Sequence, residues 1–177
     1  MLNHSRKIVL GASALSLAAL AGTALAVTNP ATGTLGATLT ILKSCQITAT
    51  TQVDFGSVDP TLATDASGVG SVSVACTKGT VITDIKLSAG GNFASGSRQM
   101  SDGTNFVPYA LFTDAAHTTA WGDGGATLPA AALSTGFVAT TSAATPQSFS
   151  VYGLVLAADE DVPTATYTDT VNITVDY

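Results

Sequence analysis

Residues 72–76 read Val72-Ser73-Val74-Ala75-Cys76, and after a Lys78-Gly79 turn the chain continues with Val81-Ile82-Thr83-Asp84-Ile85-Lys86-Leu87. Both stretches alternate apolar and polar residues, as side chains do on the two faces of a β-strand. They predict two strands around a short connection. After the first 26 residues, no stretch keeps a 3.6-residue period for three turns. The sequence therefore predicts an all-β fold.

Further strands are expected over residues 107–112, 149–156 and 168–177, between loops rich in Gly, Asp and Ala. Residues 126–144 are expected to form a long loop with one short strand, because Pro129, Gly136 and the interleaved Thr and Ser oppose the helix that alanine favours. No repeat or linker divides the chain. Several short strands in one domain indicate a β-sandwich.

The composition excludes several classes of protein. Charged residues make up 10% of the chain, with 6 Lys plus Arg against 12 Asp plus Glu, well below the ~25% of an ordinary soluble domain. So few charges disfavour a solvated helical bundle. The acidic balance argues against nucleic acid as a partner, because phosphate binding requires clustered cations.

The first 26 residues have the pattern of a secretory signal peptide. Arg6 and Lys7 precede an apolar run over residues 8–20, and Ala24-Leu25-Ala26 supplies the small residues of a cleavage site. No later segment is apolar enough to cross a bilayer, so we expect an exported mature protein without a membrane span.

The mature part contains two cysteines, Cys45 and Cys76. In an exported chain such a pair predicts one disulfide, which would close a loop of about 30 residues. A redox or metal role is not expected, because there is no CxxC motif and His117 is the single mature histidine. No cofactor is expected.

Both ends of the mature chain alternate strictly. Near the N-terminus Leu35, Ala37, Leu39 and Ile41 share one face of a potential strand, which could belong to the domain's own sheet or be given to another chain. Near the C-terminus Val171, Ile173 and Val175 form a similar face. A terminal strand without blunting charges or proline presents backbone groups that can pair with another chain.

Several blocks together resemble the spore coat protein U domain family, which includes major pilin subunits of archaic chaperone-usher pili such as Csu pili. The blocks are the alternating strand that ends four residues before Cys45, Asp54-Phe55-Gly56, residues 72–76, residues 109–124, Val151-Tyr152-Gly153 and residues 162–171. The resemblance covers essentially the whole mature chain.

The resemblance implies an incomplete immunoglobulin-like β-sandwich, residues 43–177, that lacks its last strand and is completed by donor-strand exchange. Residues 27–42 would be the donor-strand extension, with Leu35, Ala37, Leu39 and Ile41 entering the groove of another copy. Val171, Ile173 and Val175 would border that groove. A periplasmic chaperone would fill it first and grip the C-terminal Tyr177, and an outer-membrane usher would assemble the surface fibre (fimbrium), used in attachment and biofilm formation.

The chain departs from the family pattern at Leu154, where a basic residue is common, and at the acidic run Asp159-Glu160-Asp161. We expect this run to be a solvated loop, since consecutive carboxylates point in different directions and do not form a calcium cage.

Three other functions compete with that of a pilus subunit. A hydrolytic site around His117, with Thr118, Thr119, Asp114 and Asp123 nearby, lacks a nucleophile motif, so no enzyme is predicted. A carbohydrate-binding adhesin is a weaker alternative, because the aromatic residues Phe106, Tyr109 and Trp121 are expected in the core. A spore or cell-surface coat without a pilus remains open.

Overall fold

The computed structural model describes residues 30–123, 137–139 and 145–177. The chain separates into two compact units, Met1–Leu39 and Thr40–Tyr177. Within the first unit, residues 30–39 form neither helix nor strand and are exposed. The signal-peptide prediction for residues 1–26 lies outside the described residues.

The second unit contains nine strands within its described residues. They are β1 (Cys45–Thr51), β2 (Ala66–Cys76), β3 (Val81–Ile82), β4 (Asp84–Leu87), β5 (Arg98–Ser101), β6 (Phe106–Phe112), β7 (Phe137–Val138), β8 (Gln147–Val155) and β9 (Ile173–Asp176). Two short 3-10 turns, η1 (Pro60–Leu62) and η2 (Ala157–Asp159), are the helical elements of this part of the chain. In the described ranges, no helix has the length and hydropathy needed to cross a membrane.

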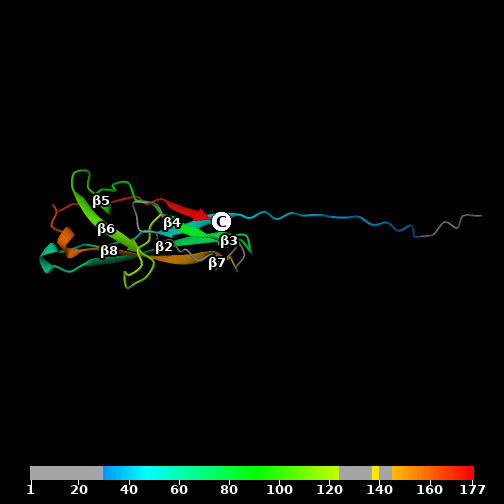
Figure 1. Cartoon of the computed structure of the whole chain (residues 1–177), viewed down its shortest axis with the longest axis horizontal. Coiled ribbons are helices and arrows are strands. Elements are labelled where there is room, and N and C mark those ends of the chain that lie inside the picture. The colour runs from blue at the N-terminus through cyan, green and yellow to red at the C-terminus, as the bar shows by residue number, and fades with distance from the viewer. Residues whose placement is uncertain (1–29, 124–136, 140–144) are drawn as a thin grey trace, which may run out of the picture. The chain divides into compact units, whose positions relative to one another are not determined.

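The strands form a large sheet and two strand pairs, and every pairing is antiparallel (Figure 1). The order in the large sheet is β1-β2-β8-β6-β5, while β3 pairs with β7 and β4 pairs with β9. The fold is therefore all-β, with curled sheets arranged as in an immunoglobulin-like sandwich. This confirms the predicted fold class.

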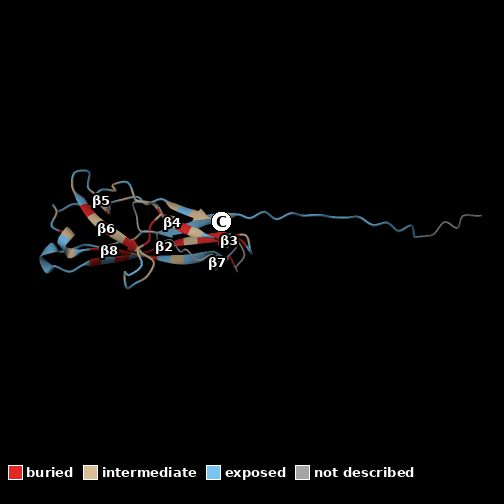
Figure 2. Cartoon of the chain, viewed as in Figure 1, coloured by how far each residue is buried: buried red, intermediate tan, exposed pale blue. Residues whose placement is uncertain are grey.

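The core lies between the large sheet and the β4–β9 pair. Val72 and Val74 of β2 and Ile85 and Leu87 of β4 are buried, and Figure 2 shows buried segments on both layers. Trp121 joins the layers, because its indole Nε1 donates to the backbone oxygen of Ile85 at 2.6 Å while its backbone N–H donates to that of Leu111 at 2.7 Å. Trp121 is buried, as the sequence predicted.

The predicted strands at residues 72–76 and 81–87 exist, but they do not pair with each other. The chain changes layers at the Lys78-Gly79 turn, and Gly79 has the positive φ of 84° that favours glycine there. β2 continues back to Ala66, and the second stretch divides into β3 and β4 at Thr83. β1 and β5 were not predicted.

The C-terminal strand is shorter than the predicted 168–177. β9 begins at Ile173, and before it the chain is tied by single contacts, an isolated bridge between Ser101 and Thr168 and a hydrogen bond from Ser88 N–H to the Asn172 oxygen. The short strand predicted within residues 126–144 corresponds in position to β7, whereas residues 126–136 and 140–144 lie outside the described residues.

Candidate functional site

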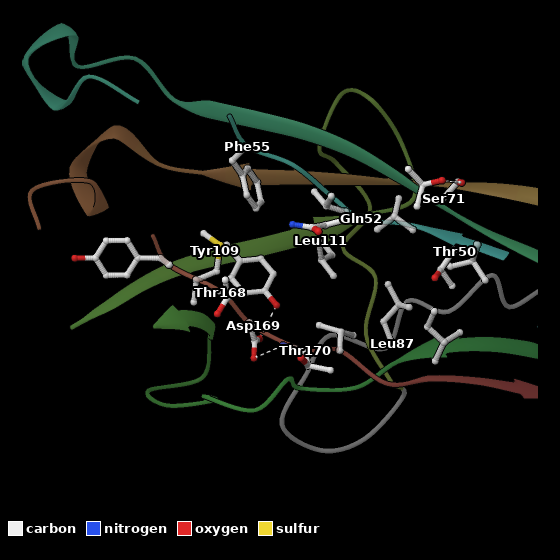
Figure 3. Close-up of a pocket in the computed structure, with 18 residues that line it drawn as sticks. Thr50, Gln52, Phe55, Ser71, Leu87, Tyr109, Leu111, Thr168, Asp169 and Thr170 are labelled. Atoms are coloured by element: carbon white, nitrogen blue, oxygen red, sulfur yellow. Dashed lines mark hydrogen bonds between the residues drawn. The ribbon is translucent and has the colours of Figure 1, made fainter. Parts of the chain in front are cut away.

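Two adjoining cavities lie between residues 52–55, which follow β1, and the segment that leads into β9. The first has a volume of about 540 Å³ and reaches Ile173. Figure 3 shows the side chains that line this first cavity. The second, about 460 Å³, shares Val53, Phe55 and Tyr167 with the first and reaches Glu160. We call the two cavities together the groove.

Most side chains that line the groove are apolar and come from both layers of the sandwich. They are Val53, Phe55, Val58, Pro60, Val72, Leu87, Met100, Val107, Tyr109, Leu111, Val151, Val155, Val162, Pro163, Ala165, Tyr167, Val171 and Ile173. An apolar groove that reaches the core is suited to an extended segment with apolar residues on one face.

The groove is bordered by two sheet edges. In the described residues β1 pairs with β2 alone and β9 pairs with β4 alone. After Cys45, every residue of β1 is exposed. An edge strand carries backbone N–H and C=O groups that can extend the sheet with another strand. Both borders of the groove can therefore hydrogen-bond to an inserted strand.

Phe55 forms part of the groove floor because a tight turn directs it inward. Asp54 accepts a hydrogen bond from Gly56 N–H at 2.8 Å, and Gly56 has a φ of 73°. The ring packs over Gly153 of β8, where a Cβ atom would lie 2.7 Å from the Phe55 ring. Phe55 also makes an edge-to-face contact with Tyr109, with ring centroids 6.1 Å apart. The Asp54-Phe55-Gly56 block thus shapes the floor.

The opposite wall is held by Asp169. Its carboxylate accepts hydrogen bonds from the Tyr109 hydroxyl at 2.7 Å and from Gly91 N–H at 2.8 Å (Figure 3 shows the Tyr109 contact). Burial and the neighbouring Asp169 carboxylate raise the pKa of Tyr109 above its ordinary value, so the hydroxyl stays protonated as a donor. A Cβ atom at Gly90 would collide with the Asp169 carboxylate.

The residues predicted for donor and groove occupy distinct places. Val171 and Ile173 line the groove, whereas Val175 pairs with Ile85 and packs against the core. Leu35 is 98% exposed, and Ala37, Leu39, Ile41 and Tyr177 are also exposed. Residues 34–41 form no strand.

The predicted disulfide is present. Cys45, the first residue of β1, is bonded to Cys76, the last residue of β2, and the two are register partners in the sheet. The bond fixes the start of the edge strand β1 beside the Lys78-Gly79 turn.

The predicted positions of Phe106 and Glu160 were wrong. Phe106 is 47% exposed, because Val107, Tyr109 and Leu111 take the inward positions of β6 and leave Phe106 on the outer face. Glu160 is buried, with 5% of its surface exposed. Its backbone N–H donates to the Ala157 oxygen at the end of η2, and this turn places the residue against the domain. Glu160 is therefore not part of a solvated loop, although Asp161 is exposed.

Asp114 binds its own loop. Its carboxylate accepts hydrogen bonds from the backbone N–H groups of Ala116, Thr118 and Thr119, at 3.1, 3.1 and 2.7 Å. His117 has a φ of 54° and packs its ring against Phe112. These contacts hold Asp114 and His117 in a structured turn. In the described residues, no group of three His, Cys, Asp or Glu side chains could hold a metal ion.

Comparison with known proteins finds a matching family model and similar solved structures. The model of the Spore Coat Protein U domain matches residues 31–174. One similar solved structure is the CsuC–CsuE chaperone–tip adhesion subunit pre-assembly complex from archaic chaperone-usher Csu pili of Acinetobacter baumannii, with 21% identity and a TM-score of 0.48. The match covers 78% of this chain and 40% of that one. No curated protein sequence matches. Since the family model spans most of the sequence, the chain belongs to the Spore Coat Protein U domain family.

Proposed function

We propose that this chain is a structural subunit of a chaperone-usher surface fibre and polymerises by donor-strand complementation. In this mechanism the N-terminal segment of one copy enters the groove of the next copy and completes its sandwich. The observation that supports this most is the apolar groove between two sheet edges, β1 and β9, in a chain whose Leu35, Leu39 and Ile41 are exposed.

The apolar face of the donor segment would contribute a large favourable term to the contact, before the costs of ordering and association. Burial of Leu35, Leu39, Ile41 and the smaller Ala37 would contribute on the order of 5 to 8 kcal/mol at ~25 cal/mol per Å². Backbone hydrogen bonds to β1 and β9 would fix the orientation of the inserted strand, which the non-directional apolar contact cannot do. Each copy supplies both a donor and a groove, so the contact joins different surfaces and repeats without closing, as a fibre requires.

The exposed apolar lining of the groove also implies that the subunit binds partners before it is assembled into a fibre. A periplasmic chaperone would cover the apolar lining and grip Tyr177, and an outer-membrane usher would exchange the chaperone for the next copy. Cleavage after Ala26 would release the donor segment in the exported protein. The fibre would lie on the cell surface and serve attachment and biofilm formation.

A structural role is favoured over catalysis by the chemistry of the groove. Its lining is mostly apolar, and in the first cavity the Tyr109 hydroxyl and the Asp169 carboxylate bind each other. A surface coat built from the same subunits is the second candidate, because the family model describes a spore coat domain. Electron microscopy of shed material separates the two, since a pilus gives thin fibres and a coat gives a layer.

The donor role is tested by a charge placed on either face of the segment. Leu39→Asp would bring a carboxylate into the groove of the next copy, which is costly without a partner. The matched control, Thr38→Asp, places the same charge on the opposite face of the strand. We expect Leu39→Asp to fold with its chaperone and form no fibres, while Thr38→Asp assembles.

Deletion of residues 27–41 extends the test. The truncated chain should bind its chaperone and fail to polymerise. Fibres from the truncated chain would refute donor exchange. A truncated chain that does not fold even with its chaperone would instead show that these residues form the first strand of the domain's own sheet.

A further inference from the structure

Six of the twelve acidic residues gather at one end of the sandwich. Because β1, β2 and β8 are antiparallel, the end of β1, the start of β2 and the end of β8 share this end, which we call the η2 end. It carries Asp54, Asp59, Asp65, Asp159, Glu160 and Asp161. In the described segments before β2 and after β8 that build this end, residues 52–65 and 156–166, there is no Lys or Arg.

Glu160 is the unusual member of this set. It lines the second cavity of the groove and is 5% exposed, and neither carboxylate oxygen has a hydrogen-bond partner within the described residues. A buried carboxylate without a partner is unfavourable and is normally matched by a cation or a donor. Within residues 52–65 and 156–166, the charged residues are all acidic.

A cationic residue, Lys43, lies two residues after Ile41, the last residue of the donor pattern. Leu35, Ala37, Leu39 and Ile41 alternate, and the next position on the same face of an extended strand is Lys43. Lys43 is exposed and has no ion-pair partner in the part of the chain that the structure describes. A strand that inserts its apolar face would therefore direct the Lys43 side chain toward the same groove.

The junction behind Lys43 is short. Thr77 donates its backbone N–H to the Ser44 oxygen at 2.9 Å and its hydroxyl to the Leu42 oxygen at 3.2 Å. These bonds hold residues 42–44 against the end of β2 in their own copy. If the segment up to Ile41 lies in a neighbouring groove, Lys43 lies where the two copies meet.

We propose that Lys43 of the incoming copy forms an ion pair with Glu160 of the copy that receives the strand. This inference rests on the proposed function and adds a partner for a specific charge. The Glu160 carboxylate would turn toward the second cavity as the strand enters. The segment would then leave the groove at the η2 end, which brings Lys43 and the nearby Lys78 to the acidic end of the neighbour. The partner is a second copy of this chain.

The experiment measures how fast subunits leave preformed fibres of the full chain at a fixed guanidinium concentration. Removal of one member of a buried charge pair acts mainly on the dissociation rate. We expect Lys43→Met and Glu160→Gln each to accelerate dissociation about tenfold or more. Lys78→Met is the matched control, because Lys78 lies at the same end of its copy but outside the inserted segment, and it should change the rate much less.

The double variant identifies the pair. If the two residues interact, Lys43→Met combined with Glu160→Gln should dissociate no faster than the single variants, and Lys43→Glu should be rescued by Glu160→Lys. Additive single effects, or an unchanged rate for Lys43→Met in fibres that form normally, would overturn the pairing and leave the proposed function intact. If the unaltered chain forms no fibres at all, the proposed function fails and the pairing falls with it.

Discussion

Tyr109 and Asp169 are 60 residues apart in the sequence and meet at 2.7 Å between hydroxyl and carboxylate. Tyr109 belongs to β6, and Asp169 lies in the segment that leads into β9. The same carboxylate accepts the backbone N–H groups of Gly91 and Thr170 at 2.8 Å each. One side chain therefore fixes the wall of the groove to both layers of the sandwich.

The Tyr109→Phe variant removes one donor and leaves Asp169 with its two backbone donors. We expect a loss of about 1 to 2 kcal/mol in the free energy of unfolding and faster amide exchange over residues 167–172. Tyr152→Phe is the control, because the Tyr152 hydroxyl makes no hydrogen bond to any described residue. Equal effects of the two variants on denaturant unfolding would contradict the role given to Tyr109.

Gly153→Ala tests the packing of the groove floor. The added Cβ would lie 2.6 Å from a Val53 methyl and 2.7 Å from the Phe55 ring, so residues 53–55 must shift. We expect a cost of about 1 to 3 kcal/mol in unfolding free energy and weaker binding of a strand in the groove.

Gly36→Ala provides the comparison for this change, because among the described residues no heavy atom beyond Gly36 and its two chain neighbours lies within 4 Å of the added methyl group. It should leave the unfolding free energy of the domain unchanged. If Gly153→Ala is equally neutral, the contact between residues 53–55 and β8 is not as tight as the distances indicate.

The alternation of residues was enough to predict the fold class and much of the core. Val72, Val74, Ile85 and Leu87 are buried as their period of two requires, because every second side chain faces the same way. The Cys45–Cys76 disulfide could also be predicted, since two cysteines in a chain expected to be exported allow one possible bond.

Strand pairing could not be predicted, because it depends on contacts between distant segments. β4 pairs with β9, so that Leu87 lies opposite Ile173, rather than with β2, which comes shortly before it in the chain.

The burial of Glu160 could not be predicted for a different reason. A run of three acidic residues suggests solvent exposure, and only the η2 turn determines which of them faces inward. For Phe106, the alternation of the residues that follow it in β6 already indicated an outward side chain.

The Cys45–Cys76 bond holds the edge strand β1 at the entry to the domain. Replacement of both cysteines by Ala should lower the unfolding free energy by roughly 3 kcal/mol, because a loop of this size gains freedom in the unfolded chain. The unfolding midpoint in denaturant measures the loss. Thiol alkylation and mass spectrometry of exported protein should find no free cysteine, and detection of both thiols would contradict the bond.

The Asp114 loop should respond to acid. The hydrogen bond from Thr118 N–H is the largest of the contacts that lower the pKa of Asp114 from 3.8 to about 2. A carboxyl group with a lowered folded-state pKa stabilises its loop fully above its ordinary pKa, and this contribution is lost as the pH falls through the folded value. The loop should therefore remain ordered at pH 4 and loosen as the pH approaches 2. The amide resonances of Thr118 and Thr119 report this transition by nuclear magnetic resonance. Asp114→Asn, which cannot titrate, should abolish it, whereas a midpoint near 3.8 in the unaltered chain would show that these hydrogen bonds do not hold the carboxylate.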